Sequence, residues 1–283
     1  MDILGSLFRR FRKEKLYLFR NRVPKDILII CILRIRNEEL IIEDTLDHIS
    51  SFADAIICYD DASTDSTFKY LKRHPKVIAI IRNFNWAESA EERIKAETVH
   101  RRKLLNLAHT FNPKWIFCAD ADERYIGDIR SFVQSEEAQD VDLIRISLFD
   151  AYLTPNNCEP YCKGQPLLNF RRYFGPERRD IVMLWKMNKN KIYYELDDSR
   201  EPQYDSNLKV ITRFYCQHYG KSLSVKHWEE TCDYYINHFP YHPYGCKWEK
   251  RKGKAIHLES DFGTPLYEWG ESLFSNAIKI HPR

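Results

Sequence analysis

The chain has 283 residues, of which 43% are hydrophobic and 14% are aromatic, and its formal net charge is +3. This composition predicts a well-filled core in one large domain or two small ones. The nearly balanced charge argues against a dedicated nucleic-acid-binding protein, which would carry a strong basic excess. No stretch reaches the roughly 18 apolar residues that a membrane-spanning helix needs.

The N-terminal arm, residues 1–23, is basic and amphipathic. It lacks the apolar core and small-residue cleavage site of a secretory signal, and three of the eight cysteines fall in apolar runs, where free cysteine behaves as a small hydrophobe. We therefore expect a reduced, cytoplasmic chain. Two alternatives stay open for the arm. It packs on its own domain, or residues 1–22 contact an anionic membrane surface peripherally, on the inner membrane face.

Short apolar runs alternate with helical patterns in the first half of the chain. Continuous apolar runs are typical of strands buried on both faces, and their alternation with helices predicts a parallel sheet with right-handed crossovers. The fold class is therefore α/β, with a Rossmann-like, mostly parallel sheet flanked by helices. The expected strands cover residues 27–33, 55–59, 77–81 and 115–119, and the expected helices cover residues 40–49, 66–73 and 87–109.

The second half of the chain is more elaborate, with proline- and glycine-containing loops between its elements. We find no internal repeat and no low-complexity linker, so residues 126–283 are expected to extend the same domain. The expected strands cover residues 141–149, 167–174, 186–196 and 208–218, and a helix is expected over residues 224–238.

Polar clusters follow three of the expected strands, at residues 34–39, 60–67 and 120–123. Ligands of open α/β sheets bind beyond the carboxyl ends of the strands. Asp120 and Asp122 are one residue apart, and strand alternation directs such a pair to the same side. The pair predicts a site for a cation that prefers oxygen ligands, although an ordinary acidic loop is the alternative. No glycine lies between Ser6 and Gly127, which argues against a dinucleotide or Walker loop.

Four motifs occur in a characteristic order: Arg36-Asn37-Glu38-Glu39, Asp60-Asp61-Ala62-Ser63-Thr64-Asp65-Ser66-Thr67, Asp120-Ala121-Asp122-Glu123, and His218. Through them the chain resembles the family 2 glycosyltransferases, which have the nucleotide-sugar-binding fold called GT-A. The resemblance covers roughly residues 26–125. It implies an inverting, metal-dependent transferase that moves a sugar from a UDP- or GDP-sugar to a glycan, lipid or protein acceptor. Residues 24–125 would be the nucleotide-sugar-binding half, and residues 126–283 the acceptor-binding half.

The resemblance also implies roles for single residues. The expected metal ligands for Mn²⁺ or Mg²⁺ are Asp120, Asp122 and His218, and Asp120 is also a candidate for the ribose. The expected donor contacts are Asp61 to the base, and Arg34, Arg36, Arg82 and Arg102 to the base or phosphates. The candidate catalytic bases are Asp198 and Glu201, beside Asp197. Arg36 stands where the family usually has an aromatic residue.

Two other functions are compatible with these patterns. A sugar nucleotidyltransferase would share the fold, but such enzymes usually carry a Gly-rich loop after the first strand, and residues 34–39 contain no glycine. A non-catalytic carbohydrate-binding protein of the same fold would not need the acidic triplet.

Overall fold

The computed structural model describes residues 13–187, 191–196, 200–240 and 244–281. Two compact units are built from interleaved segments of the chain. Unit 1 consists of Met1–Ala121, Arg130–Leu143 and Met183–Lys209, and unit 2 consists of Asp122–Ile129, Ile144–Val182 and Val210–Arg283.

Unit 1 contains the parallel sheet that the apolar runs predict. Its four parallel strands are buried almost throughout, as continuous apolar runs require. Strand β1 (Glu14–Leu18) pairs antiparallel with β4 at one edge, and the last residues of β8 (Tyr173–Lys186) pair antiparallel with β5 at the other. The parallel strands lie in the order β4 (Val77–Asn83), β3 (Ala55–Asp61), β2 (Ile29–Ile35) and β5 (Trp115–Ala119).

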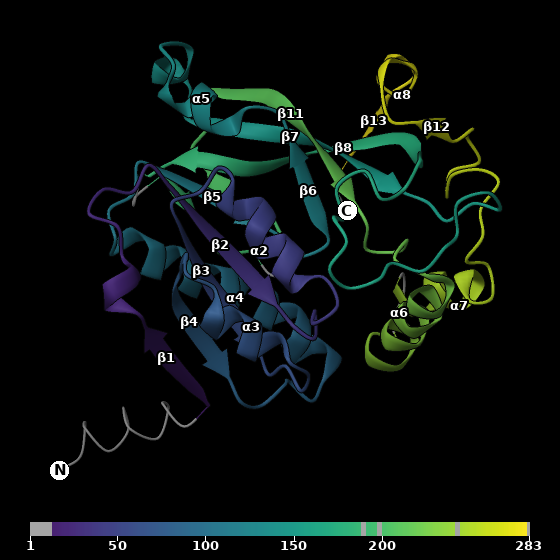
Figure 1. Cartoon of the computed structure of the whole chain (residues 1–283), viewed down its shortest axis with the longest axis horizontal. Helices are drawn as coiled ribbons and strands as arrows, with labels where there is room; N and C mark the ends of the chain where they lie inside the picture. The colour runs from purple at the N-terminus through teal and green to yellow at the C-terminus, as the bar shows by residue number, and fades with distance from the viewer. Residues whose placement is uncertain (1–12, 188–190, 197–199, 241–243, 282–283) are drawn as a thin grey trace. The chain divides into compact units, whose positions relative to one another are not determined.

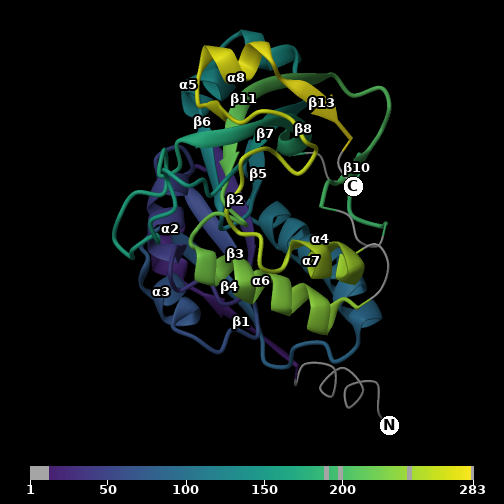
Figure 2. The same cartoon turned by 90° about the vertical axis from the view of Figure 1, so that its right-hand side faces the viewer.

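Helices cover both faces of this sheet, as Figure 2 shows. Helices α2 (Ile42–Ser50) and α3 (Thr67–Arg73) lie on one face, and α4 (Ala90–His109) lies on the other. The first turn of α4 carries a capping box, in which Ser89 and Glu92 each accept a hydrogen bond from the other's backbone N–H. The three helices confirm the α/β prediction for this part of the chain. Unit 1 also contains the short pair β9 (Ile192–Tyr193) and β10 (Gln203–Tyr204).

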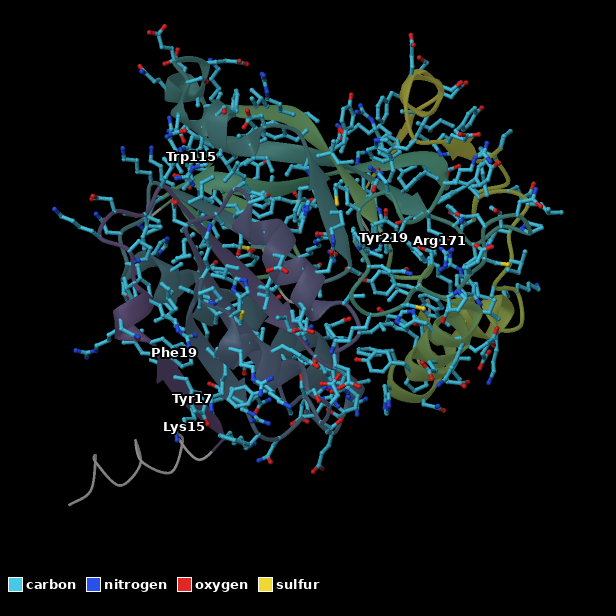
Figure 3. The ribbon with its side chains drawn as sticks, viewed as in Figure 1. Lys15, Tyr17, Phe19, Trp115, Arg171 and Tyr219 are labelled. Carbon is cyan, nitrogen blue, oxygen red and sulfur yellow. The ribbon has the colours of Figure 1, made fainter. Side chains whose placement is uncertain are left out.

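The described part of the N-terminal arm packs on its own sheet. Lys15, Tyr17 and Phe19 follow one another along β1 and just beyond it (Figure 3). The ring of Tyr17 packs edge-on against Phe68, and the 3₁₀ turn η1 (Arg20–Arg22) follows. This supports the first of the two alternatives for residues 13–22, whereas residues 1–12 lie outside the described residues.

Unit 2 contains a second group of strands, which Figure 1 labels. The described helices of the chain include none that is long and apolar enough to cross a membrane. A small core joins α6 (Val225–His238) to α7 (Tyr244–Arg251) through Trp228, Cys232 and Trp248. The main strands are β8, β7 (Leu143–Ala151), β11 (Val210–His218) and β6 (Glu123–Ile126), in that order, with β12 (Tyr267–Glu268) and β13 (Ile278–Ile280) beside β8. The helices are α6, α7 and α8 (Glu271–Ser275), and α5 (Ile129–Gln134) begins in unit 2 and ends in unit 1.

The predicted strand at residues 167–174 is wrong for most of its length, because residues 167–172 form a loop and β8 begins only at Tyr173. The loop is organised around the buried side chain of Arg171, which donates hydrogen bonds to the carbonyl oxygens of Ser222 and Glu159. Figure 3 labels Arg171 and Tyr219 of this region. Burial lowers the pKa of Arg171 to about 10. A buried cation that binds loop carbonyls leaves no periodic signal in the sequence.

Candidate functional site

The loops after β2 and β3 are joined by hydrogen bonds between their motif residues. The backbone N–H of Asn37 donates to Ser63 Oγ (3.0 Å), and that of Thr64 donates to Asn37 Oδ1 (2.8 Å). Glu38 N–H donates to Thr67 Oγ1 (2.8 Å). Asn37 and Ala62 have positive φ angles of 53° and 55°, which is uncommon for residues other than glycine. Most polar residues of these two motifs therefore fix the shape of the strand ends.

Asp61 lies buried at the end of β3 and engages two neighbouring side chains. Its Oδ2 accepts a hydrogen bond from Arg34 Nη2 (2.9 Å), and its Oδ1 accepts one from Asn83 Nδ2 (3.0 Å). The Arg34 side chain is 23% exposed, whereas that of Asp61 is 3% exposed. Asp61 thus holds Arg34 at the surface of unit 1, where a ligand can reach the guanidinium.

Arg36 is fixed from two directions. Its Nη1 donates to the carbonyl oxygens of Asp61 (2.7 Å) and Ala62 (2.8 Å). Its guanidinium lies 4.2 Å from the ring centroid of Trp86, and the guanidinium of Arg93 lies 4.1 Å from the same centroid. Such cation–π contacts orient the guanidinium plane. Trp86, which sequence reasoning did not single out, therefore contacts the guanidinium groups of both Arg36 and Arg93.

His100, on the buried face of α4, orients Arg34. Its ring stacks on Tyr59 with centroids 3.8 Å apart, and its Nδ1 accepts a hydrogen bond from Arg34 Nε (3.3 Å). Burial, together with the charge of Arg34, lowers the pKa of His100 to about 2. The ring is therefore neutral, and its 3.8 Å approach to Asp61 Oδ2 is not an ion pair.

Asp120 follows β5 and lies between two arginines. Its Oδ1 is 3.1 Å from Nη2 of Arg101, and its Oδ2 is 3.3 Å from Nε of Arg200. Arg101 is buried on α4 and also contacts Glu97 Oε1 (3.2 Å) and Cys118 Sγ (3.0 Å). Burial alone would lower the pKa of Arg101. The carboxylates of Asp120 and Glu97 instead hold this pKa well above its ordinary value.

Two arginines that the sequence singled out have partners inside unit 1. Arg102 is exposed and donates from Nε to the carbonyl oxygen of Tyr194 (2.6 Å). Arg82 Nε lies 3.3 Å from Asp60 Oδ2, and its guanidinium stacks on Phe68 at 3.8 Å. The residue of α4 that reaches the acidic motif is Arg101, and the donor contact predicted for Arg102 stays a prediction.

The described residues on either side of the candidate bases have separate contacts: Leu196 is bound to α4, and Arg200 contacts Asp120. Thr98 Oγ1 donates to the carbonyl oxygen of Leu196 (2.7 Å), and Arg200 contacts Asp120. Glu201 is partly buried, directly after Arg200. Asp197 and Asp198 lie outside the described residues. The first described residue after Asp198, Arg200, therefore lies beside the carboxylate that follows β5, and the last described residue before Asp197, Leu196, is bound to α4.

Unit 2 contains a candidate group of its own, formed by Asp122 and His218. Asp122 Oδ2 lies 3.2 Å from His218 Nε2, and His218 Nδ1 lies 2.6 Å from Asp150 Oδ1. The pairing of β6 with β11 produces this arrangement, because it sets Glu123 opposite His218. Asp150 at the end of β7 was not predicted, since a carboxylate near the end of a strand is common.

Two carboxylates, Asp122 and Asp150, hold the imidazole of His218 in place. Burial alone would lower the pKa of His218, but Asp122 and Asp150 raise it to about 10. For Asp150 burial acts in the opposite direction and would raise the pKa, but Arg179 and Lys221 hold this pKa well below its ordinary value. The chain alone thus has an imidazolium between two carboxylates, with Asp150 fixing the Nδ1 side and Nε2 directed at Asp122.

Gly220 approaches this pair too closely to carry a side chain unless the pair moves. A Cβ at position 220 would lie 2.5 Å from Asp122 Oδ2 and 2.9 Å from His218 Nε2. A carboxylate oxygen and an imidazole nitrogen at this separation suit a divalent cation such as Mn²⁺. Within the described ranges, no group of three or more His, Cys, Asp or Glu side chains could hold a metal ion. A cation at this pair would need further ligands from outside these two side chains.

No protein-family model and no curated protein sequence matches the chain. Among solved structures, glucosyl-3-phosphoglycerate synthase from Mycobacterium tuberculosis, in complex with Mn²⁺, uridine diphosphate and phosphoglyceric acid, is 19% identical, with a TM-score of 0.29 over 44% of this chain and 43% of that chain. TarS from S. aureus, in complex with UDP, is 11% identical, with a TM-score of 0.35 over 78% of this chain and 68% of that chain. The chain thus spans less than half the length of the first protein. Similarity at this level does not assign the chain to a family.

Proposed function

We propose that this chain is a glycosyltransferase with the GT-A fold, and on its motifs a member of family 2. It would move a sugar from a UDP- or GDP-sugar to a glycan or lipid-linked acceptor, with inversion. The observation that carries the proposal is the charged group at the carboxyl ends of neighbouring parallel strands: Arg34 in β2, Asp61 in β3 and Asp120 after β5. Ligands of open α/β sheets bind at this edge.

The donor nucleotide would be held by side chains of unit 1. Arg34 is the partly exposed partner of Asp61, and Arg36 has its guanidinium plane fixed by Trp86. Oriented guanidinium groups bind phosphate oxygens in pairs and stack on bases. Asp61 fixes Arg34 and remains the proposed acceptor of a hydrogen bond from the base. Asp120 is proposed to contact the ribose or the metal.

The proposed metal ligands of unit 2 are Asp122 and His218, and Asp120 precedes Asp122 by two positions in the sequence. A bound Mn²⁺ or Mg²⁺ would neutralise the charge of a departing nucleoside diphosphate. The protein's own task is to hold Asp122 Oδ2 and His218 Nε2 close together. Asp150 accepts the hydrogen bond from Nδ1–H, which leaves Nε2 as the ligand atom.

Inversion needs a carboxylate that takes the proton of the acceptor hydroxyl. We propose Asp198 for this role, with Glu201 as the second candidate. Support comes from the described ends of their loop, where Leu196 is bound by Thr98 and Arg200 contacts Asp120.

The test is incubation of the full chain with UDP-sugars and GDP-sugars, with and without Mn²⁺. The proposal predicts release of nucleoside diphosphate and loss of this activity in Asp122→Ala. The matched control is Asp233→Ala, which removes an exposed carboxylate of unit 2 that pairs with Lys252. Full activity in Asp122→Ala would show that the metal assignment is wrong. Release of pyrophosphate would instead identify a nucleotidyltransferase, and sugar binding without nucleotide or metal would identify a non-catalytic binding protein.

A further inference from the structure

An exposed apolar segment follows α7 in unit 2, in the yellow stretch that joins α7 to β12 in Figure 1. Leu258 is 83% exposed, Phe262 is 52% exposed and Ile256 is 40% exposed. Leu258 has the highest exposure of the large apolar side chains described as exposed. Exposed apolar side chains that gather in one place mark interaction sites, so this segment is a candidate binding surface.

The backbone of this segment is held firmly by the residues between the exposed ones. His257 N–H donates to the carbonyl oxygen of Leu153 (2.8 Å), and its ring packs edge-on against Trp228 with centroids 5.0 Å apart. Ser260 N–H donates to the carbonyl oxygen of Thr264 (2.8 Å), and Ser260 Oγ donates to Glu177 Oε1 (2.9 Å). The apolar side chains are therefore presented on an anchored loop, so binding would require little further ordering of the backbone.

Basic residues precede the apolar ones. Residues 247–254 contain five basic residues and one acidic residue. Lys252 pairs with Asp233, and Arg251 pairs with Asp261. Among the described residues, the exposed side chains of Lys250 and Lys254 have no hydrogen bond or ion pair. The segment thus offers two exposed lysines without an ion-pair partner directly before its apolar side chains, although the exposed Glu249 and Glu259 lie in the same stretch.

We propose that Lys250, Lys254, Ile256, Leu258 and Phe262 form a docking surface for an anionic phospholipid bilayer. Apolar side chains that insert at the headgroup boundary and lysines that attract anionic lipid act together in peripheral membrane binding. Three apolar side chains supply far less than the roughly 800 Å² per partner that a stable protein interface buries. Insertion into a bilayer requires only that side chains project from a fixed loop. This surface belongs to unit 2 and contains none of the candidate site residues.

The test is flotation of the full chain with vesicles of phosphatidylcholine alone and of phosphatidylcholine mixed with phosphatidylglycerol. Binding is expected only with the anionic vesicles, and it should weaken with added salt. The double variant Leu258→Ser/Phe262→Ser should bind at least about tenfold more weakly, since each removes apolar surface. Lys250→Gln/Lys254→Gln should also lose about tenfold or more, because each lysine contributes about fivefold.

The matched controls are Ile278→Ser, which replaces another exposed apolar side chain of unit 2 (48% exposed), and Lys226→Gln, which replaces an exposed lysine paired with Glu230. Both should bind as the unaltered chain does. Equal binding to neutral vesicles, or anionic binding that neither double variant weakens, would overturn the proposal. A dimer that dissociates in Leu258→Ser/Phe262→Ser would overturn it as well, because the surface would then join two copies.

Discussion

Gly220→Ala tests the site geometry with a change of one methyl group. The added Cβ would lie 2.5 Å from Asp122 Oδ2 and 2.9 Å from His218 Nε2. Since a normal contact is about 3.5 Å, the carboxylate oxygen must move by about 1 Å. Both crowded atoms are ends of side chains, so the fold can accommodate the methyl group. Replacing glycine also reduces the entropy of the unfolded chain, so we expect the free energy of unfolding to change by less than about 1 kcal/mol.

Metal affinity should respond much more strongly than stability. A misplacement of about 1 Å at a site that binds through two side chains should weaken Mn²⁺ binding about 10- to 100-fold. Isothermal titration calorimetry with Mn²⁺, and urea unfolding of the same sample, measure the two quantities separately. The control is Gly164→Ala, where a Cβ meets nothing within 4 Å but φ is +90°. It should lose about 1–2 kcal/mol of stability and keep its metal affinity. Unaltered Mn²⁺ affinity in Gly220→Ala would refute the assignment of Asp122 and His218 as ligands.

Three further predictions concern the neighbours of the site. Asp150→Asn should weaken Mn²⁺ binding about 10- to 100-fold by calorimetry, because it removes the carboxylate that orients His218; unchanged affinity would count against this role. Arg101→Leu should lower the free energy of unfolding by about 1–3 kcal/mol in urea, because Asp120 loses one of its two arginine partners and keeps Arg200, and a loss below about 0.5 kcal/mol would contradict this. The pKa of His100 is lowered to about 2, so the unfolded chain binds the proton first as pH falls below about 6.5. Stability should therefore drop by about 2 kcal/mol between about pH 6.5 and 5, and this part of the drop should be absent in His100→Phe.

The parallel strands of unit 1 could be predicted because their apolar runs are continuous, and burial on both faces leaves few other structures for such runs. Val77 and Trp115 begin their strands as predicted, and the extra residues at the ends of β3 and β4 are polar. The sequence was enough to recognise those polar ends as a ligand-binding edge. It was not enough to predict the hydrogen bonds that their side chains form with one another.

The interactions inside the site depend on contacts that sequence spacing does not specify. Arg101 and Arg102 are adjacent residues of the same type. Only Arg101 lies on the buried face of α4, which also carries Thr98, Leu105 and Ala108. That periodicity could have selected Arg101. Asp150 could not have been selected, because it meets His218 across strands that lie far apart in the sequence.

The most direct measurement is an anomalous difference map at the manganese edge from a crystal grown with Mn²⁺ and UDP or GDP. The proposed function predicts a peak about 2.0–2.3 Å from Asp122 Oδ2 and His218 Nε2, with nucleotide density beside Arg34 and Arg36. A manganese peak with nucleotide density that touches none of these four side chains would contradict it.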